Sequence, residues 1–388
     1  MIDRLIYLDH AATTPLDQRV LAAMMPFLTG MSGNASSIHY VGRAALQALD
    51  DAREQVAQVL GCQPKEIVFT SGGSESINLA IKGVAMALRA QGKTHLIGSA
   101  IEHHAVLHAL DYLVEYEGFT VTLLPVDRSG RVNPADLATA IRPETALVSV
   151  MYANNETGII QPIAELAAIC RERGVLFHTD AVQAPGQLPL DVQALGVDLL
   201  SLTAHKFYGP QGVGVLYLRR GTPLVPQING GAQERRRRAG TENVAGIVGL
   251  AKALEIAECE RGDYFTRLRA LSDRLIDGVL TRIPHSWLNG DRVYRLPSIV
   301  NLGFAGIETE SLLLLLDQRG ICASSGSACT SGSLEPSHVL LAMGLAPHEA
   351  NGSIRFSLGR QTTEAQIDTL LDVLPDLVGQ LRTLTPCG

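Results

Sequence analysis

Short apolar runs rich in β-branched residues alternate with helical patterns along most of the chain. The stretches 76–91 and 163–173 have helical periodicity, and Gly174 is suited to end the second of them. Strands that alternate with helices in this way are typical of βαβ units on a mostly parallel sheet. The expected strands lie at 66–70, 95–100, 120–126, 146–152, 175–179, 199–202 and 214–218.

The pattern changes gradually after about Ala257. A charged helical stretch at 261–280 is followed by a strand-like run at 298–304 and then by a closing helix. Thr363 and Gln366 have the spacing of a capping box in front of that last helix. The fold class predicted is therefore α/β, a large doubly wound domain with a mostly parallel sheet followed by a smaller α+β C-terminal domain.

Composition narrows the class of protein. The chain has 388 residues and a formal net charge of −7, which argues against nucleic-acid binding despite the basic run 235–238. Its purely apolar runs, such as 312–316, are far shorter than the ~20 residues of a membrane span, and no signal-peptide pattern opens the sequence. The six cysteines show no CxxC pair or regular spacing, so we expect no metal site, no disulfide framework and a cytoplasmic location.

Two residues stand out as candidates for covalent chemistry. Cys329 lies in the middle of the small, polar run 324–333, whereas a free cysteine is usually buried as a small apolar side chain. This context favours a reactive thiol over an incidental one only when other features support it. Lys206 provides such support, because a lysine that follows an apolar run is suited to form a Schiff base.

Polar groups also follow several of the expected strands. The segment 71–76 joins a strand to a helix and is suited to cradle a phosphate, although an N-cap with a tight turn explains it equally well. His103 and His104 are a poor metal chelate, and ring stacking or proton transfer is the better functional interpretation beside that of a structural histidine. Asp180 follows an apolar run, where a carboxylate needs a partner such as a protonated ring nitrogen. Asn155 lies after another strand.

These motifs, in this order, resemble the fold-type I enzymes that use pyridoxal phosphate, in the class V aminotransferase group. More closely, the chain resembles cysteine desulfurases of the branch that serves iron–sulfur cluster assembly and nitrogenase maturation. The resemblance spans essentially the whole sequence and rests on segments 7–15, 69–76, 204–206, 238–241 and 324–331. With it, the expected domains are 16–257 for the large cofactor-binding domain, and 1–15 plus 258–388 for the small domain that carries the Cys329 loop.

The resemblance implies roles for a set of cofactor-binding residues. Lys206 matches the lysine that holds the cofactor, Asp180 the acid on the pyridine nitrogen, and Gln183 the partner of the ring hydroxyl. His103 matches the ring-stacking and acid–base histidine. The phosphate contacts and a further cofactor contact correspond to Gly73, Ser74, Thr203, His205, Asn155 and, from the second subunit of a homodimer, Thr241.

The resemblance also implies the reaction. Arg355, helped by Asn34, matches the residue that binds the carboxylate of L-cysteine, and Cys329 matches the thiol that takes its sulfur as a persulfide and leaves L-alanine. The persulfide then passes to an iron–sulfur scaffold or another acceptor protein. General cluster assembly, nitrogenase maturation and thiolation of transfer RNA all remain open as its destination, as does activity on selenocysteine.

Some positions depart from the usual pattern of these enzymes. Ala35, Ile77 and Gln233 replace a proline, a polar residue and a histidine, which affects pocket detail and dimer contacts rather than the reaction. Cys322 is an extra thiol that we expect to lie in the core. Two other classes remain as alternatives: another enzyme on this scaffold, such as an aminotransferase or a selenocysteine lyase, and a binding protein without activity. The thiol-bearing loop argues against an aminotransferase, and the complete set of catalytic residues argues against a binding protein.

Overall fold

A seven-stranded sheet organises the larger part of the computed structural model, which describes residues 5–31, 33–326 and 335–384. The strand order is β2-β8-β7-β6-β5-β3-β4, in which β8 alone is antiparallel to its neighbours. This confirms the mostly parallel sheet. Its strands are β2 (Ile67–Thr70), β3 (His95–Ser99), β4 (Thr120–Leu124), β5 (Thr145–Ser149), β6 (Leu176–Asp180), β7 (Leu199–Thr203) and β8 (Gly214–Leu218).

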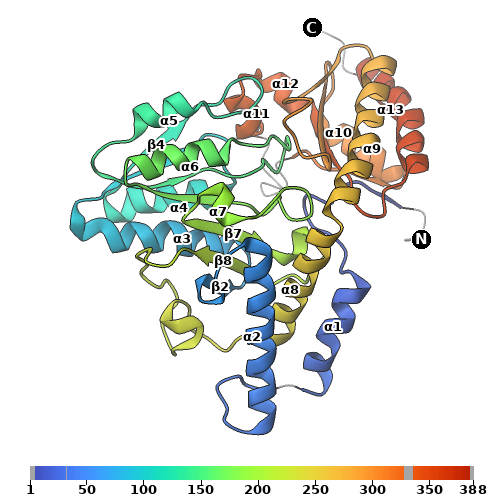
Figure 1. Ribbon diagram of the computed structural model, residues 1–388. Helices are drawn as coiled ribbons and strands as arrows, with labels where there is room; N and C mark the ends of the chain where they lie inside the picture. Colours follow the sequence, from blue (N-terminus) through green and yellow to red (C-terminus); the bar gives the residue numbers. More distant parts are fainter. Residues whose placement is uncertain (1–4, 32, 327–334, 385–388) are drawn as a thin grey trace.

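Helices cover both faces of this sheet (Figure 1). Along β8, Val215 and Tyr217 point into one hydrophobic cluster, whereas Leu216 and Leu218 point into another. Successive side chains of a strand face opposite ways, so this alternation places packed helices on each side and confirms the doubly wound fold. The surrounding helices are α2 (Tyr40–Leu60), α3 (Gly73–Leu88), α4 (His104–Glu117), α5 (Pro134–Ala140), α6 (Ile163–Glu172), α7 (Val192–Leu195) and α8 (Val244–Cys259).

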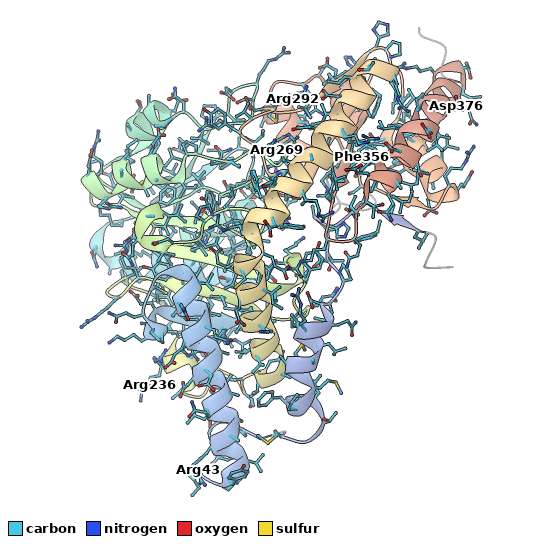
Figure 2. All side chains as sticks on the ribbon, turned by 45° about the vertical axis from the view of Figure 1, so that its right-hand side comes forward. Arg43, Arg236, Arg269, Arg292, Phe356 and Asp376 are labelled. Carbon is cyan, nitrogen blue, oxygen red and sulfur yellow. The ribbon has the colours of Figure 1, made fainter. Side chains whose placement is uncertain are left out.

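The C-terminal part has its own small sheet and hydrophobic cluster. β10 (Ile299–Phe304) lies between β9 (Ser286–Leu288) and β12 (Ser353–Ser357), and both pairings are antiparallel. The expected capping box is present, since Thr363 and Gln366 exchange backbone-to-side-chain hydrogen bonds. Helices α9 (Arg261–Arg282), α10 (Thr309–Gln318) and α13 (Glu364–Leu384) pack around Phe356, which Figure 2 shows within this part. Two short helices, α11 (His338–Ala342) and α12 (Pro347–Asn351), complete it.

The N-terminal segment joins the C-terminal part. β1 (Ile6–Tyr7) pairs in parallel with β11 (Ile321–Cys322), and Leu8 belongs to the C-terminal hydrophobic cluster. The division into 16–257 and 1–15 plus 258–388 stays a prediction, and this pairing supports it. Cys322, expected in the core, is instead only half-buried.

The sequence patterns did not reveal α1 (Gln18–Thr29) or the long α2, which pack together on α8 (Figure 1). Gly61 ends α2 in the left-handed conformation, with φ 65°. The loop between α1 and α2 lies far from the carboxyl edge of the sheet, and this position matters for Asn34 below.

Candidate active site

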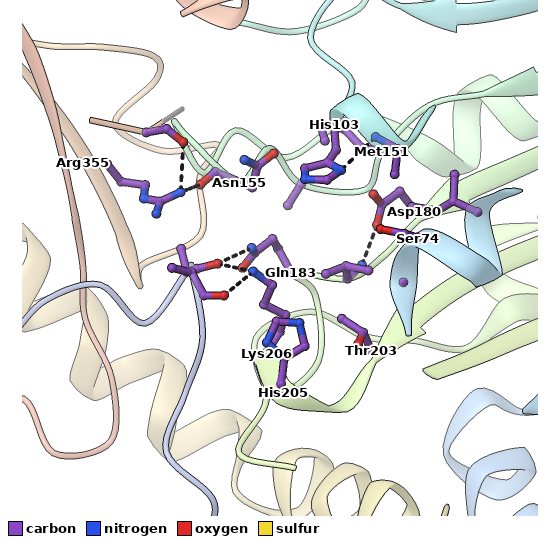
Figure 3. Close-up of a pocket in the computed structure, with 18 residues that line it drawn as sticks. Ser74, His103, Met151, Asn155, Asp180, Gln183, Thr203, His205, Lys206 and Arg355 are labelled. Atoms are coloured by element: carbon purple, nitrogen blue, oxygen red, sulfur yellow. Dashed lines mark hydrogen bonds between the residues drawn. The ribbon is translucent and has the colours of Figure 1, made fainter. Parts of the chain in front are cut away.

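One cavity of about 370 Å³ brings together most of the predicted site residues. β2, β3, β5, β6 and β7 run in the same direction, because β2 and β7 are each antiparallel to β8, so their carboxyl ends share one edge. Open α/β sheets bind ligands at this edge. Figure 3 shows the predicted residues that line the cavity, namely Gly73, Ser74, His103, Asn155, Asp180, Gln183, Thr203, His205, Lys206 and Arg355.

The turn between β2 and α3 forms an anion cradle. α3 is a 16-residue helix that begins at Gly73, so the backbone N–H groups of its first turn and the positive end of its dipole point toward the cavity. Close packing requires glycine here, since a Cβ on Gly214 of β8 would lie only 2.7 Å from the carbonyl carbon of Gly72. The neighbouring wall is apolar, because Ile77 lines the cavity and is almost fully buried.

Lys206 reaches the cavity from the turn that follows β7. Its Nζ donates hydrogen bonds to the carbonyl oxygens of Ala11 and Ala12, at 2.6 and 2.7 Å. Gln183 donates to the same Ala11 oxygen at 3.1 Å. The N-terminal segment therefore holds the lysine in place through the backbone of Ala11 and Ala12.

Asp180 is the last residue of β6 and is 5% exposed. Its Oδ1 accepts a hydrogen bond from the Val182 N–H at 2.9 Å. Burial raises the pKa of the Asp180 carboxyl to about 6, although this hydrogen bond and the charge of Lys206 oppose the rise. A buried carboxylate of this kind is stabilised by a cationic group placed in the cavity.

His103 and its neighbour His104 have different surroundings. His103 is the N-cap of α4, and its Nδ1 accepts from the Ala105 N–H at 3.1 Å. Burial and then the charge of Lys206 lower the pKa of His103 to about 4, so its ring is neutral near pH 7. His104 does not line the cavity and instead stacks near His338, at 4.7 Å between ring centroids. This arrangement supports His103 as the functional residue of the pair.

Thr203 and His205 lie shortly before the lysine in the chain. His205 Nδ1 lies 3.1 Å from the Thr13 hydroxyl, while burial and the charge of Lys206 lower the pKa of His205 to about 4. The Thr203 hydroxyl donates to the Val213 carbonyl at 3.3 Å. Both residues also line a second hollow of about 440 Å³, which opens beside the anion cradle.

Arg355, on β12, closes the other end of the cavity with a guanidinium group that is 2% exposed. Its Nη1 donates to the carbonyl oxygens of Asn155 at 2.9 Å and Gly326 at 3.4 Å, and its Nη2 donates to Asp9 Oδ1 at 2.8 Å. Its Nε is buried without a hydrogen-bond partner among the described residues. The cavity therefore ends in a cation with an unused donor.

Two of the predicted site residues, Asn34 and Thr241, do not line this cavity. Asn34 is exposed in the loop after α1, where its side chain accepts from the Ser36 N–H. Thr241 is also exposed and lies outside the cavity within one chain. Cys329 lies outside the described residues. The roles of all three stay predictions.

Sequence reasoning missed several groups at the site. Glu102, directly before His103, is fully buried, and burial raises the pKa of its carboxyl to about 8. Glu156 accepts from the Ser337 hydroxyl at 2.5 Å, beside Gly326. Asp9 holds Arg355. Glu102 accepts from the nearby Ser99 hydroxyl and from the distant Met151 N–H, whereas the partners of Glu156 and Asp9 are far away in the sequence.

The described residues lack two further features. No group of three or more His, Cys, Asp or Glu side chains in this part of the chain is arranged to hold a metal ion. No helix within the same residues is long and apolar enough to cross a membrane.

Comparisons with known proteins agree with this geometry. The aminotransferase class-V family model matches residues 6–370. A cysteine desulfurase IscS from Dictyoglomus turgidum is 54% identical over 383 residues, which cover 99% of this chain and 97% of the relative. A solved NifS-like protein superposes with a TM-score of 0.91 at 39% identity, over 97% of this chain and 100% of that one. The structure of SspA in complex with cysteine is 38% identical, with a TM-score of 0.78, over 91% of this chain and 98% of that one.

Proposed function

The chain belongs to the class-V aminotransferase family and is a pyridoxal phosphate-dependent cysteine desulfurase, and from this premise we propose which of its residues perform the reaction. L-cysteine is its substrate. The proposal assigns cofactor binding to the sheet edge, substrate binding to Arg355 and sulfur transfer to Cys329.

The residues of the cavity fit the cofactor. The anion cradle at Gly73 and Ser74, with Thr203 and His205, offers donors to a phosphate group. Across the cavity, the carboxyl of Asp180, with its pKa raised by burial, is suited to pair with a protonated pyridine nitrogen. The site is completed by Lys206 as the covalent anchor and by Gln183 as the partner of the ring hydroxyl. His103 is the stacking residue, and Asn155 makes a further contact.

Bound pyridoxal phosphate supplies an electron sink for the charge that develops when the substrate loses its Cα proton. Lys206 is the base for that proton, and the carbonyl oxygens of Ala11 and Ala12 hold its Nζ in the cavity. His103, whose pKa is lowered to about 4, is neutral near pH 7 and can therefore accept or relay a proton beside the cofactor.

Arg355 is suited to bind the substrate carboxylate. It lines the cavity, and among the described residues its Nη2 donates only one of its two N–H bonds, to Asp9. A carboxylate in the cavity gains a charge-assisted hydrogen bond from this guanidinium. Asn34 is absent from this cavity within one chain, so its predicted help to Arg355 requires that a second chain supplies it.

Cys329 takes the sulfur. Its thiolate forms a bond to the sulfur of L-cysteine while the carbon–sulfur bond breaks, and the bonding electron pair stays on carbon and is protonated to give L-alanine. The enzyme keeps a persulfide, and no external oxidant or reductant is needed. This assignment is supported by Gly326, directly before the segment, whose carbonyl oxygen accepts from Arg355 Nη1 at 3.4 Å. Ser337, after the segment, donates to Glu156, which lies next to Gly326.

The working unit is a homodimer in which Thr241 of one chain contacts the phosphate in the other. The hollow beside the anion cradle, lined by residues such as Ser71, Glu75 and Gln211, offers room for a loop of a second chain. The basic run is anchored close by, because Arg238 forms an ion pair with Glu75 at 2.8 Å.

The sulfur acceptor is an iron–sulfur scaffold or another protein that accepts a persulfide. A cytoplasmic location is supported by the scattered cysteines of the sequence, since the four that the structure describes, Cys62, Cys170, Cys259 and Cys322, are unpaired. Identification of the protein that co-purifies with the persulfide form will decide between cluster assembly, nitrogenase maturation and transfer-RNA thiolation.

The observation that carries these assignments is the convergence of Lys206, Asp180 and the anion cradle on one cavity. Borohydride reduction of the yellow holoenzyme, followed by peptide mass spectrometry, should place the reduced cofactor on Lys206. Lys82 is the matched control, since burial lowers the pKa of its amine, but its Nζ lies over the Tyr112 ring. An adduct on Lys82, or a colourless protein, would contradict the assignment.

A further inference from the structure

Asp9 and Arg355 form an ion pair at the substrate end of the cavity. Asp9 Oδ1 accepts from Arg355 Nη2 at 2.8 Å, and the two side chains are 21% and 2% exposed. Asp9 itself does not line the cavity, so it acts on a ligand without touching it.

The donors of Arg355 can be counted. A guanidinium has five N–H bonds, and the structure uses two from Nη1, to Asn155 and Gly326, and one from Nη2, to Asp9. The Nε–H and one N–H of Nη2 remain. Nε has no partner among the described residues and almost no accessible surface, so a ligand in the cavity is left with the second N–H of Nη2. A ligand carboxylate that binds there must share Nη2 with Asp9.

The backbone around Asp9 is held in place by hydrogen bonds. On one side of it, the Leu8 carbonyl accepts from the Ser357 N–H at 2.7 Å. On the other side, the Ala11 N–H donates to the Ser357 hydroxyl at 2.9 Å, and the Tyr7 hydroxyl donates to the Asp9 carbonyl. Ser357 is on the same strand as Arg355, so this segment and the arginine are held together.

We infer that Asp9 is a positioning residue that shares Arg355 with the carboxylate of the bound amino acid and so weakens the binding of substrate and product. The inference rests on the proposed role of Arg355. One buried cation then faces two anions, and their mutual repulsion lowers the affinity for L-cysteine and for L-alanine. Weaker binding of L-alanine speeds its release, which an enzyme needs when substrate and product carry the same carboxylate.

The test uses Asp9→Asn holoenzyme and a ligand that cannot react with the cofactor. Propionate carries the carboxylate of alanine without its amine, and propionamide is its uncharged counterpart. Ligand-observed NMR should show propionate bound about tenfold more tightly by Asp9→Asn than by the wild type, and propionamide bound equally by both. The inhibition constant of L-alanine should fall by a similar factor.

Several controls make the outcome decisive. Asp9→Glu keeps the charge and should bind propionate like the wild type, and Asp17→Asn removes a remote carboxylate that pairs with Arg19 and Arg360. Asp9→Ser is a second uncharged variant with the same expected result if Asp9→Asn does not fold. Equal or weaker propionate binding by these uncharged variants overturns the inference, because it shows that Asp9 only aligns the arginine.

Arg355→Gln separates this inference from the proposed function. If Arg355→Gln binds propionate as well as the wild type, the proposed role of Arg355 is wrong, and the inference about Asp9 is wrong with it. If Arg355→Gln loses propionate binding while the uncharged Asp9 variants show no gain, only the inference about Asp9 is wrong.

Discussion

The two ends of the cavity are built differently. At the cofactor end, each polar side chain follows a strand of one sheet, and its position depends on the residues next to it in the sequence. At the substrate end, Arg355 is held by Asp9 and Gly326 and by the backbone of Asn155, segments that the sequence separates widely. The first end is a property of the sheet, whereas the second exists only when the N-terminal segment and the C-terminal part are packed together.

This difference suggests a division of labour. The cofactor end must hold one molecule in one orientation through every turnover, and a rigid sheet edge suits that task. The substrate end must admit cysteine, present it to a thiol and release alanine. Its contacts join segments from different parts of the fold, and one of them is made by Gly326, directly before the segment that carries Cys329.

The strongest test of this division is Cys329→Ser. If the cofactor end is independent of the thiol, this variant should bind the cofactor normally and still show a change in cofactor absorbance when L-cysteine is added. L-alanine production should fall by about 10⁴-fold or more, because a hydroxyl is a far poorer nucleophile toward sulfur than a thiolate.

The matched control is Cys322→Ser. Cys322 is half-buried on β11, and burial raises the pKa of its thiol, which disfavours the reactive thiolate. Turnover of this variant should stay near normal. A Cys322→Ser protein that makes no alanine, beside an active Cys329→Ser protein, would show that the sulfur acceptor has been misassigned.

A smaller effect is expected when the substrate end alone is weakened. Arg355→Lys keeps a positive charge but loses the planar fork, so kcat/KM for L-cysteine should fall about 10²-fold, mainly through KM. Cofactor absorbance should stay unchanged. Arg360→Lys, whose ion pair with Asp17 is remote from the cavity, is the control. A loss of cofactor in Arg355→Lys would argue that the two ends are not separable.

The same difference explains what the sequence could predict. Asp180 and Lys206 were identified because strand ends, helix starts and turns have local signatures, and the capping box at Thr363 is equally local. The contact of Asp9 with Arg355 joins residues 346 positions apart and leaves no local signal, although Asp9 lies inside a quoted motif. The sequence patterns do not predict the helices α1 and α2 for a related reason, since these helices are stabilised largely by packing on the distant α8.

A third test concerns the charge of the cofactor end. Burial raises the pKa of Asp180 to about 6, above its usual 3.8, so the folded cofactor-free protein keeps a proton that the unfolded chain releases between those values. The free energy of unfolding should therefore fall as pH rises from about 4 to about 6 and stay lower above that. Relative to Asp180→Asn, the wild type should lose up to about 3 kcal/mol across this range.

Urea unfolding of both cofactor-free proteins at pH 4.5 and 7.5 should show about 2 kcal/mol of this loss. The comparison between the variants removes the contributions of other titrating groups, because Asp180→Asn keeps the shape of the side chain. Bound cofactor should abolish the pH dependence if its ring nitrogen pairs with Asp180. A wild-type protein that gains stability relative to Asp180→Asn as pH rises would mean that the buried carboxyl is already paired.

The smallest effect is expected from mixed dimers, which test whether the cofactor end is complete within one chain. Lys206→Ala and Thr241→Ala should each be nearly inactive, for lack of the covalent anchor and of the phosphate contact from the second chain. In a mixed dimer, one site combines both substitutions, whereas the other has the native lysine from one chain and the native threonine from its partner. Equal mixing makes about half of the dimers mixed, so activity should recover to about a quarter of the wild-type value.

Lys206→Ala mixed with Asp180→Asn is the control, since every site there carries one defect if both residues act in the same chain. Proven subunit exchange without recovery in the first mixture would show that each chain builds its own phosphate site, and the exposed position of Thr241 would then need another explanation.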